Sequence, residues 1–384
     1  MKRQRTALIV GGGVGGIVAA KRLRRLLPRE HRVVLVEREE QHVFQPSLLW
    51  LAVGRRKPEQ IQRPLARLGR YGFEVVRGEI TALDPERRQV RIGADTLEGD
   101  AVVISLGAEL APERVSGLGV AGHNLYTLPG TLALRDALRN FRSGRVVVLT
   151  AAPAYKCPAA PYEAAMLVAD SLTRQAAGGG WSVDLFAAEA APMATAGPEV
   201  AAAVRALVEA RGIHYHPEHQ VVQVEPESRT LRFSNGVSAE YELLIYVPPH
   251  AAPEVVRAAG LTGESGWVSV DARTLATPVP GVYAIGDVTS IPLPSGRPLP
   301  KAGVFARRQA EVVAENIAAD WAGRPPERTF DGKGACFIEA GAGRAGYGSG
   351  DFYATPAPVM RLYAPSRWWY FGKVLVEKRW LRQF

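Results

Sequence analysis

Cys157 and Cys336 are the only cysteines among the 384 residues, and both could carry out redox chemistry. A pair of thiols can cycle between dithiol and disulfide forms, whereas a lone buried cysteine usually acts as a small apolar side chain. Two cysteines are too few for the disulfide framework of a small secreted protein. On the residues alone, the two thiols are either one redox pair or two unrelated buried side chains.

A glycine-rich turn near the start of the sequence has the spacing of a dinucleotide site. A predicted strand at 6–10 leads into the turn, a helical pattern follows at 17–23, and a second predicted strand at 32–37 ends in Glu37. The glycines of the turn are Gly11, Gly12, Gly13, Gly15 and Gly16. Glycines let the backbone approach a pyrophosphate, the helix N-terminus offers N–H groups, and the carboxylate accepts ribose hydroxyls. The alternative is a glycine-rich structural turn.

A second segment, far along the chain, supplies another carboxylate. The apolar run within 277–287 ends in Gly286-Asp287, so a strand would deliver Asp287 where a helix begins. A carboxylate placed there can accept a hydrogen bond from a ribityl hydroxyl. Together with the glycine turn, this segment predicts an FAD site assembled from both parts of the chain.

The elements around Cys157 repeat the βαβ pattern without its glycines. A strand is predicted at 145–150 and a helix at 161–172, with further strands at 183–186 and 243–247. The turn at 151–158, which contains Cys157, has no glycine, and side chains there would block a pyrophosphate. The predicted fold class is therefore α/β with two Rossmann-like, doubly wound domains plus a C-terminal interface or membrane-associated segment, and the turn of the second domain does not suit a pyrophosphate.

These motifs together resemble the two-dinucleotide-domain flavoproteins, and further segments narrow the resemblance. The passage 156–163 is similar to sulfide:quinone oxidoreductases and to the flavoprotein subunit of flavocytochrome c sulfide dehydrogenase. Other segments similar to that family are 41–46, 300–303, 334–339 and 368–381. The resemblance covers essentially the whole chain, and the placement of both cysteines is its most specific part.

The resemblance implies a mechanism and a role for each site residue. Cys157 and Cys336 would form the disulfide that sulfide attacks, and Glu163 would accept a proton. Lys301, which precedes a predicted helix at 304–319, would stabilise the negative charge of the reduced flavin. Glu163 could instead be a favourable charge early in a helix, and Lys301 an ordinary solvated lysine. Since both thiols are needed for the bridge, we predict non-covalent FAD.

The sequence departs from the family pattern at two places. Many relatives carry a third cysteine in the region that here reads 123–127, and some carry a histidine in the region 191–195; this chain has neither. Proton handling at the second place is therefore unassigned. We predict no metal site.

Composition and the C-terminal segment bear on partners. The net charge of +9 could favour anionic partners, but no zinc-knuckle spacing or aromatic-basic repeat indicates nucleic acid. We expect no signal peptide and no transmembrane helix. Residues 366–384 combine aromatic and basic side chains, which suits a membrane interface, and the resemblance implies a peripheral location at the inner (cytoplasmic) membrane. The alternative is a segment docked on the protein or on a second subunit, since a homo-oligomer is possible.

These observations predict four segments and one activity. The segments are an FAD-binding domain at 1–110 and 247–325, a second Rossmann-like domain at 111–246, and a C-terminal domain at 326–384. The activity that the resemblance implies is FAD-dependent oxidation of sulfide through a Cys157/Cys336 disulfide, with a membrane quinone as acceptor. Its immediate rival is oxidation of another thiol or persulfide at the same cysteine pair. The alternatives are a sulfide dehydrogenase with a cytochrome acceptor, an NADH:quinone oxidoreductase and a non-enzymatic flavin redox sensor.

Overall fold

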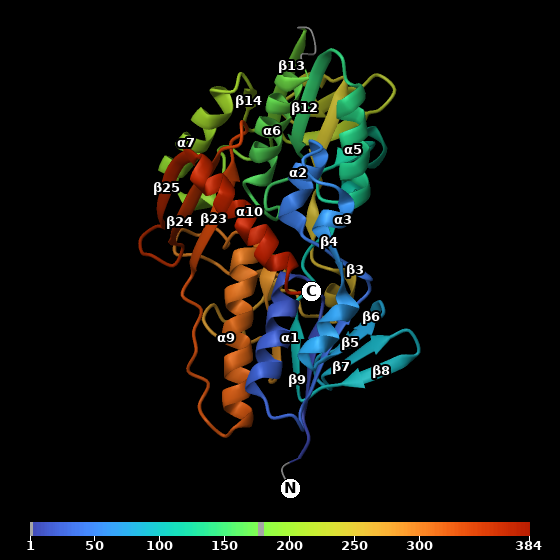
Figure 1. The fold of residues 1–384 in the computed structure, drawn as a ribbon, viewed down its shortest axis with the longest axis vertical. Helices are drawn as coiled ribbons and strands as arrows, with labels where there is room; N and C mark the ends of the chain where they lie inside the picture. Colours follow the sequence, from blue (N-terminus) through green and yellow to red (C-terminus); the bar gives the residue numbers. More distant parts are fainter. Residues whose placement is uncertain (1–2, 176–179) are drawn as a thin grey trace.

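Two parallel five-stranded sheets, one in each half of the molecule, organise the fold (Figure 1). The structure is a computed structural model that describes residues 3–175 and 180–384. Each sheet is covered by helices on one face and by a small antiparallel sheet on the other. This arrangement confirms the predicted fold class.

The first parallel sheet combines strands from distant parts of the chain. Its strands, in spatial order, are β21 (Val282–Ala284), β9 (Ala101–Ile104), β1 (Thr6–Val10), β2 (Arg32–Glu37) and β5 (Glu74–Arg77). Helices α1 (Val14–Leu26) and α9 (Gly303–Trp321) pack on one face, and β6 (Ile80–Asp84), β7 (Gln89–Ile92) and β8 (Asp95–Glu98) cover the other. Because both faces are covered, the central strands are almost wholly apolar and buried.

The second parallel sheet has the same construction. Its strands, in spatial order, are β11 (His123–Asn124), β18 (Leu243–Val247), β12 (Gly144–Thr150), β13 (Trp181–Ala187) and β14 (His214–His216). Its helices are α5 (Leu128–Asn140), α6 (Ala160–Arg174) and α7 (Pro198–Glu209). Its antiparallel cover is β15 (Val221–Glu225), β16 (Thr230–Phe233) and β17 (Ser238–Glu240). All of its strands thus lie between residues 123 and 247.

The last part of the chain crosses the junction between the two halves. Strands β23 (Lys333–Glu339), β24 (Ala345–Asp351) and β25 (Val359–Ser366) form an antiparallel sheet. Helix α10 (Arg367–Leu381) follows and runs from this sheet toward α1 (Figure 1). The Ser366 hydroxyl accepts the Trp369 N–H and so caps the helix at its N-terminus.

Short elements complete the chain. The antiparallel pair β10 (Glu109–Leu110) and β19 (His250–Ala251) joins the two halves where the chain enters and leaves the second. The other short strands and helices are β3 (Gln41–Val43), β4 (Gln62–Pro64), β20 (Val268–Ser269), β22 (Thr289–Ser290), α2 (Leu48–Ala52), α3 (Pro58–Ile61), α4 (Leu118–Ala121) and α8 (Glu254–Ala258). Within the described ranges, no helix combines the length and apolar character needed to cross a membrane.

Candidate functional site

A cavity of about 2610 Å³ lies at the junction between the two halves, and it gathers most of the predicted site residues. Those that line it are Gly11, Gly13, Gly15, Glu37, Cys157, Glu163, Gly286, Asp287, Lys301 and Cys336. Gly16 lies behind the wall, where a Cβ would come within 1.9 Å of the Gly11 carbonyl oxygen. The structure therefore brings together groups as far apart in the sequence as Gly11 and Cys336.

The glycine turn is packed tightly on the protein side and open on the cavity side. Gly11 has a φ of +105°, and a Cβ there would lie 2.3 Å from the Ser105 carbonyl oxygen. A Cβ on Gly13 would meet nothing within 4 Å. At the end of β2, Glu37 Oε2 accepts the Gly12 N–H at 2.6 Å, which fixes the carboxylate beside the turn. The open side thus has the space and the free N–H groups that a pyrophosphate cradle at the N-terminus of α1 requires.

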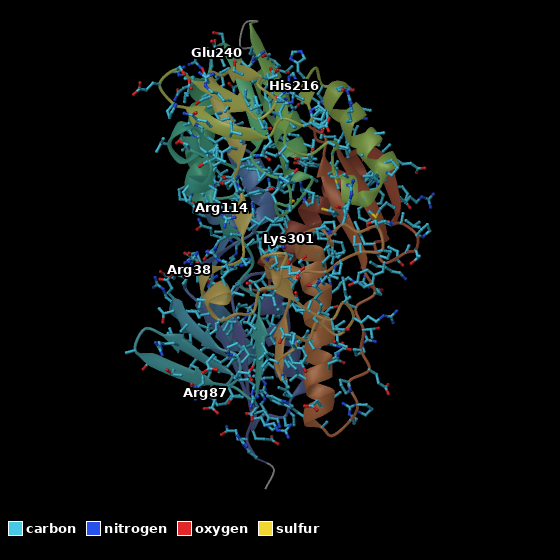
Figure 2. The ribbon with its side chains drawn as sticks, turned by 180° about the vertical axis from the view of Figure 1, so that it is seen from behind. Arg38, Arg87, Arg114, His216, Glu240 and Lys301 are labelled. Atoms are coloured by element: carbon cyan, nitrogen blue, oxygen red, sulfur yellow. The ribbon has the colours of Figure 1, made fainter. Side chains whose placement is uncertain are left out.

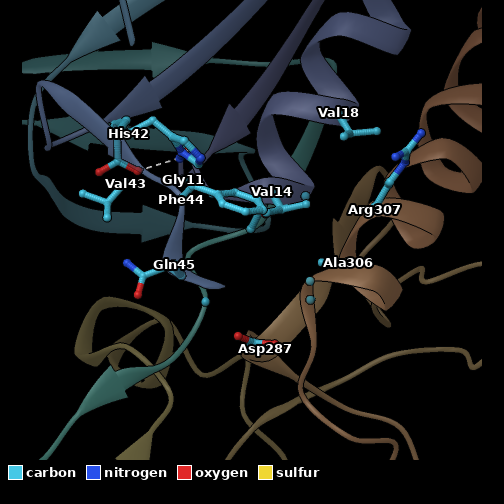
Figure 3. Close-up of a pocket in the computed structure, with 18 of the residues that line it drawn as sticks. Gly11, Val14, Val18, His42, Val43, Phe44, Gln45, Asp287, Ala306 and Arg307 are labelled. Atoms are coloured by element: carbon cyan, nitrogen blue, oxygen red, sulfur yellow. Dashed lines mark hydrogen bonds between the residues drawn. The ribbon is translucent and has the colours of Figure 1, made fainter. Parts of the chain in front are cut away.

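Asp287 faces the same cavity from the other segment, with Gly11 and His42 on the opposite wall (Figure 3). It lies in a single 3-10 turn, Gly286–Val288, which begins where Gly286 has a φ of +74°. Asp287 Oδ1 is buried and has no hydrogen-bond partner among the described residues. Burial raises the pKa of Asp287, and the charges of Lys156 and Lys301 partly offset this. Such an unpaired oxygen fits a ribityl hydroxyl, so the turn and Asp287 together fit FAD.

Lys301 lies near the middle of the molecule and is not a solvated surface lysine (Figure 2). Its ammonium donates to the carbonyl oxygens of Asp287 at 2.8 Å and Thr289 at 2.9 Å. It also lies 3.4 Å from the ring centroid of Trp267. Burial lowers the pKa of Lys301 to about 8, although Asp287 opposes the shift. Its role toward a flavin stays a prediction.

Both cysteines are free thiols on the cavity wall. Cys157 adopts a φ of +51°, which is strained for a residue with a side chain, and its N–H donates to the Lys301 carbonyl oxygen at 2.7 Å. Burial raises the pKa of Cys157, and negative charge on Glu163 and on Cys336 raises it further. Cys336, on β23, is exposed to the cavity, and desolvation together with negative charge on Glu163 raises its pKa to about 11. The disulfide between them stays a prediction.

Glu163 lies in the first turn of α6, but its carboxylate is buried and bound to other groups. Its Oε1 accepts the Glu339 N–H at 2.8 Å and a proton of the Lys373 ammonium at 2.9 Å. Neither partner of Glu163 was predicted from the sequence. Lys373 is a lone basic residue in the middle of α10, and Glu339 is the last residue of the 334–339 segment. No local pattern could have paired either residue with Glu163.

The corresponding turn of the second unit is filled by its own side chains. Tyr155 is buried in the loop between β12 and α6, and its hydroxyl donates to Glu189 Oε1. Tyr162 donates to the same oxygen at 2.7 Å, and Thr150 donates to Oε2 at 2.8 Å. Glu189 follows β13 as Glu37 ends β2. The acid that would accept ribose hydroxyls is therefore already bound to three hydroxyls of the protein.

His42 of β3 joins the glycine turn to the end of α10. Its Nδ1 lies 3.4 Å from the Gly12 carbonyl oxygen, and its Nε2 accepts the Trp380 Nε1–H at 2.8 Å. The ring also stacks on Phe384, with centroids 5.0 Å apart. Burial lowers the pKa of His42 to about 4, so the ring is neutral at pH 7.

Helix α10 has two apolar faces, which explains why its sequence forms no single stripe. One face, which includes Tyr370 and Trp380, packs against the protein core. The other leaves large side chains exposed: Trp368 by 84%, Phe371 by 61% and Leu375 by 63%. One helix thus both packs against the protein and presents an exposed apolar surface.

The model of the pyridine nucleotide-disulphide oxidoreductase family matches residues 5–310. The chain belongs to this family. Among curated relatives, the mitochondrial sulfide:quinone oxidoreductase of Mus musculus is 24% identical over 369 residues, which are 92% of this chain and 80% of that protein. The sulfide-quinone reductase of Aquifex aeolicus is 27% identical over 401 residues, covering 97% of this chain and 90% of that protein.

The solved structures include one with the same overall fold. The X-ray structure of the Aquifex aeolicus sulfide:quinone oxidoreductase matches with a TM-score of 0.89 at 24% identity, covering 99% of this chain and 91% of that chain. This likeness establishes that the fold extends over the C-terminal sheet and α10, which lie beyond the matched family model.

Proposed function

We propose that the protein is an FAD-dependent sulfide:quinone oxidoreductase. The observation that carries the proposal is the position of two thiols, Cys157 and Cys336, on the wall of the cavity that also holds the dinucleotide cradle. The names of the relatives support the donor and the acceptor. FAD, when bound, supplies two-electron transfer between a thiol pair and an acceptor.

In the proposed reaction, the resting form is a disulfide between Cys157 and Cys336. Hydrosulfide attacks one sulfur, a new S–S bond forms as the old one breaks, and the products are a persulfide and a thiolate on the other cysteine. Glu163 receives the proton of the attacking sulfur, and its contact with Lys373 holds it in place. Both cysteines are used in this step, so neither is available to attach FAD, and binding is non-covalent.

The exposed face of α10 supports a membrane quinone as the acceptor. Trp368, Phe371 and Leu375 recur at helical spacing on one face, and Val376 beside them also lines the cavity. Exposed basic residues flank this face and complement anionic lipid headgroups: Arg367, Lys378, Arg379 and Arg382. We propose that this face contacts the inner (cytoplasmic) membrane peripherally and that the quinone enters beside it.

An anaerobic titration followed at the flavin absorbance tests the donor. Sulfide at micromolar concentration should bleach the flavin of the wild-type protein, and NADH should not. Cys157→Ser should lose the response to sulfide, since the bridge cannot form, while its flavin content stays unchanged. Bleaching by NADH alone would overturn the proposal in favour of an NADH-dependent enzyme, and full activity of the serine variant would remove the thiol mechanism.

Co-sedimentation with liposomes that contain anionic lipid tests the membrane contact. Trp368→Ser, Phe371→Ser and Leu375→Ser combined should weaken binding by about tenfold or more, since about 3 residues' worth of apolar surface no longer leaves water. Val120→Ser is the matched control, because Val120 on α4 is 83% exposed and lies outside this face. Unchanged binding of the triple variant would contradict the contact.

A further inference from the structure

A line of charged side chains runs from the thiol site to the surface. Lys373 Nζ lies 2.9 Å from Glu163 Oε1 and 3.8 Å from Glu339 Oε1. Arg55 then lies 3.8 Å from Glu339 Oε2 and 2.6 Å from Asp170 Oδ2. The first five side chains of the line are at most 15% exposed: Glu163, Lys373, Glu339, Arg55 and Asp170. Arg174, which pairs with Asp170, is 54% exposed. The line therefore begins at the cavity wall and ends in solvent.

Glu339 is the group in this line that its surroundings satisfy least. It is fully buried, and neither carboxylate oxygen has a hydrogen-bond partner among the described residues. Two donors nearby, Arg55 Nη1 and Trp50 Nε1, are also buried without a hydrogen-bond partner. Several unsatisfied polar atoms around one carboxylate indicate a place for water or for a proton.

The charges around Glu339 decide which carboxylate holds a proton. Glu163 and Glu339 share the single ammonium of Lys373. Glu163 accepts two hydrogen bonds, whereas Glu339 accepts none. Burial raises the pKa of Glu339; Lys373 and Arg55 oppose the rise, and Glu163 adds to it. Burial alone would lower the pKa of Lys373, but the charges of Glu163 and Glu339 raise it.

We propose that Lys373 and Glu339 form, with Glu163, a proton exit path that leads from the thiol site past Arg55 to Asp170, which pairs with the exposed Arg174. The proposal rests on the proposed function, because a proton path is needed only if the site releases a proton. Oxidation of hydrosulfide to sulfane sulfur releases one. A cofactor and an acceptor in the cavity would cover the direct route to water. The buried line offers a second route from Glu163 to solvent.

Each step of the path moves protons and no electrons. Glu163 takes a proton from the sulfur donor and becomes neutral, which frees the Lys373 ammonium to pair with Glu339. Glu339 then releases its own proton through water to Asp170, beside the exposed Arg174. One proton enters at Glu163 and one leaves at Asp170. When Glu163 later gives its proton to Glu339 through the Lys373 ammonium, the resting charges are restored.

Infrared spectroscopy of the holoenzyme tests the resting state directly. At pH 7 the protein should show the C=O stretching band of a buried protonated carboxylic acid, shifted in D₂O and absent from Glu339→Gln. Glu377→Gln is the matched control: Glu377 is also buried, but Arg56 and Ser47 bind its carboxylate, so it should contribute no band. A band that persists in Glu339→Gln would overturn the proposal, as would its loss in Glu377→Gln alone.

Proton release during reduction tests the path. After anaerobic mixing with sulfide in weak buffer, an indicator dye should report proton release in step with flavin bleaching. Glu339→Gln should slow release relative to bleaching by at least about tenfold, and Glu339→Asp should restore most of it. A purely structural role would slow both signals together, and coincident signals in the glutamine variant would overturn the path. Failure of sulfide to bleach the wild-type flavin would instead contradict the proposed function. The infrared band would still show whether Glu339 is protonated.

Discussion

The two βαβ units of this protein have the same sheet, helix and antiparallel cover, yet their turns differ in what they leave open. In the first, Gly13 faces empty space and Glu37 lies beside it. In the second, Tyr155 fills the turn and Glu189 is bound to three hydroxyls. The comparison shows that the sheet does not make a nucleotide site. The turn and the acid after the second strand do so, and they can be closed without loss of the fold.

The closed turn of the second unit places Cys157 on the cavity wall. Cys157 lies in this turn, in a left-handed conformation that its N–H bond to Lys301 helps to hold. A glycine turn that wrapped a pyrophosphate would leave no place for this thiol on the cavity wall. Under the proposed function, the filled turn is therefore a position for sulfur chemistry where the first unit has a position for a nucleotide.

The largest expected effect comes from closing the open turn. Gly13→Val should fold normally, because its backbone at φ −73° and ψ −171° suits a side chain and nothing lies within 4 Å of the new Cβ. The side chain would occupy the pyrophosphate space and weaken FAD binding by about 100-fold or more, roughly 3 kcal/mol. The ratio of flavin to protein absorbance measures the loss. Gly16→Ala should instead fail to fold, and a yellow, flavin-loaded Gly13→Val would contradict the cradle.

A smaller expected effect is the pH dependence of stability that His42 of the first unit causes. The pKa of His42 is about 4 in the folded protein and about 6.5 when unfolded. Between these values the unfolded state binds more protons, so stability falls as pH falls. At pH 5 the loss should be about 2 kcal/mol relative to pH 7. Denaturant unfolding at both pH values measures it.

His42→Asn supplies the control for that pH effect. It should be less stable at pH 7, since the Trp380 contact changes, but its pH 7 to pH 5 difference should shrink by about 2 kcal/mol. An equal pH dependence in both proteins would show that His42 is not the group that titrates. Burial also lowers the pKa of His123 on β11 and of His250 on β19, so the pH dependence that remains in the variant comes in part from these two residues.

The smallest effect comes from loosening the closed turn. Tyr155→Phe removes one of the three hydroxyls that bind Glu189 and should lower the free energy of unfolding by about 1–2 kcal/mol. Flavin content should not change. Tyr241→Phe is the matched control: that buried hydroxyl has no partner among the described residues, so its removal should cost little. Binding of NADH by Tyr155→Phe would mean that the second unit is a nucleotide site closed by a single contact.

Local sequence patterns predicted the framework of both units. Strands expected at 32–37 and 243–247 have those bounds, and the helix expected at 304–319 extends over Gly303–Trp321, because apolar periodicity and glycine spacing are local properties. The contacts between Glu163 and Lys373 and between His42 and Trp380 join residues more than 200 positions apart, and no local pattern reports them. The C-terminal segment was ambiguous because α10 is apolar on two faces.

The pairing of β21 with β9 at the edge of the first sheet affects the order in which the two sheets can fold during synthesis. All five strands of the second sheet lie between residues 123 and 247, so this sheet can assemble while the chain is still being synthesised. The first sheet needs Val282–Ala284, which leaves the ribosome after the whole second unit. Closing that long loop slows its completion. The half of the protein that begins first is therefore the half that finishes last, and its cofactor site is complete only after the whole second unit has been synthesised.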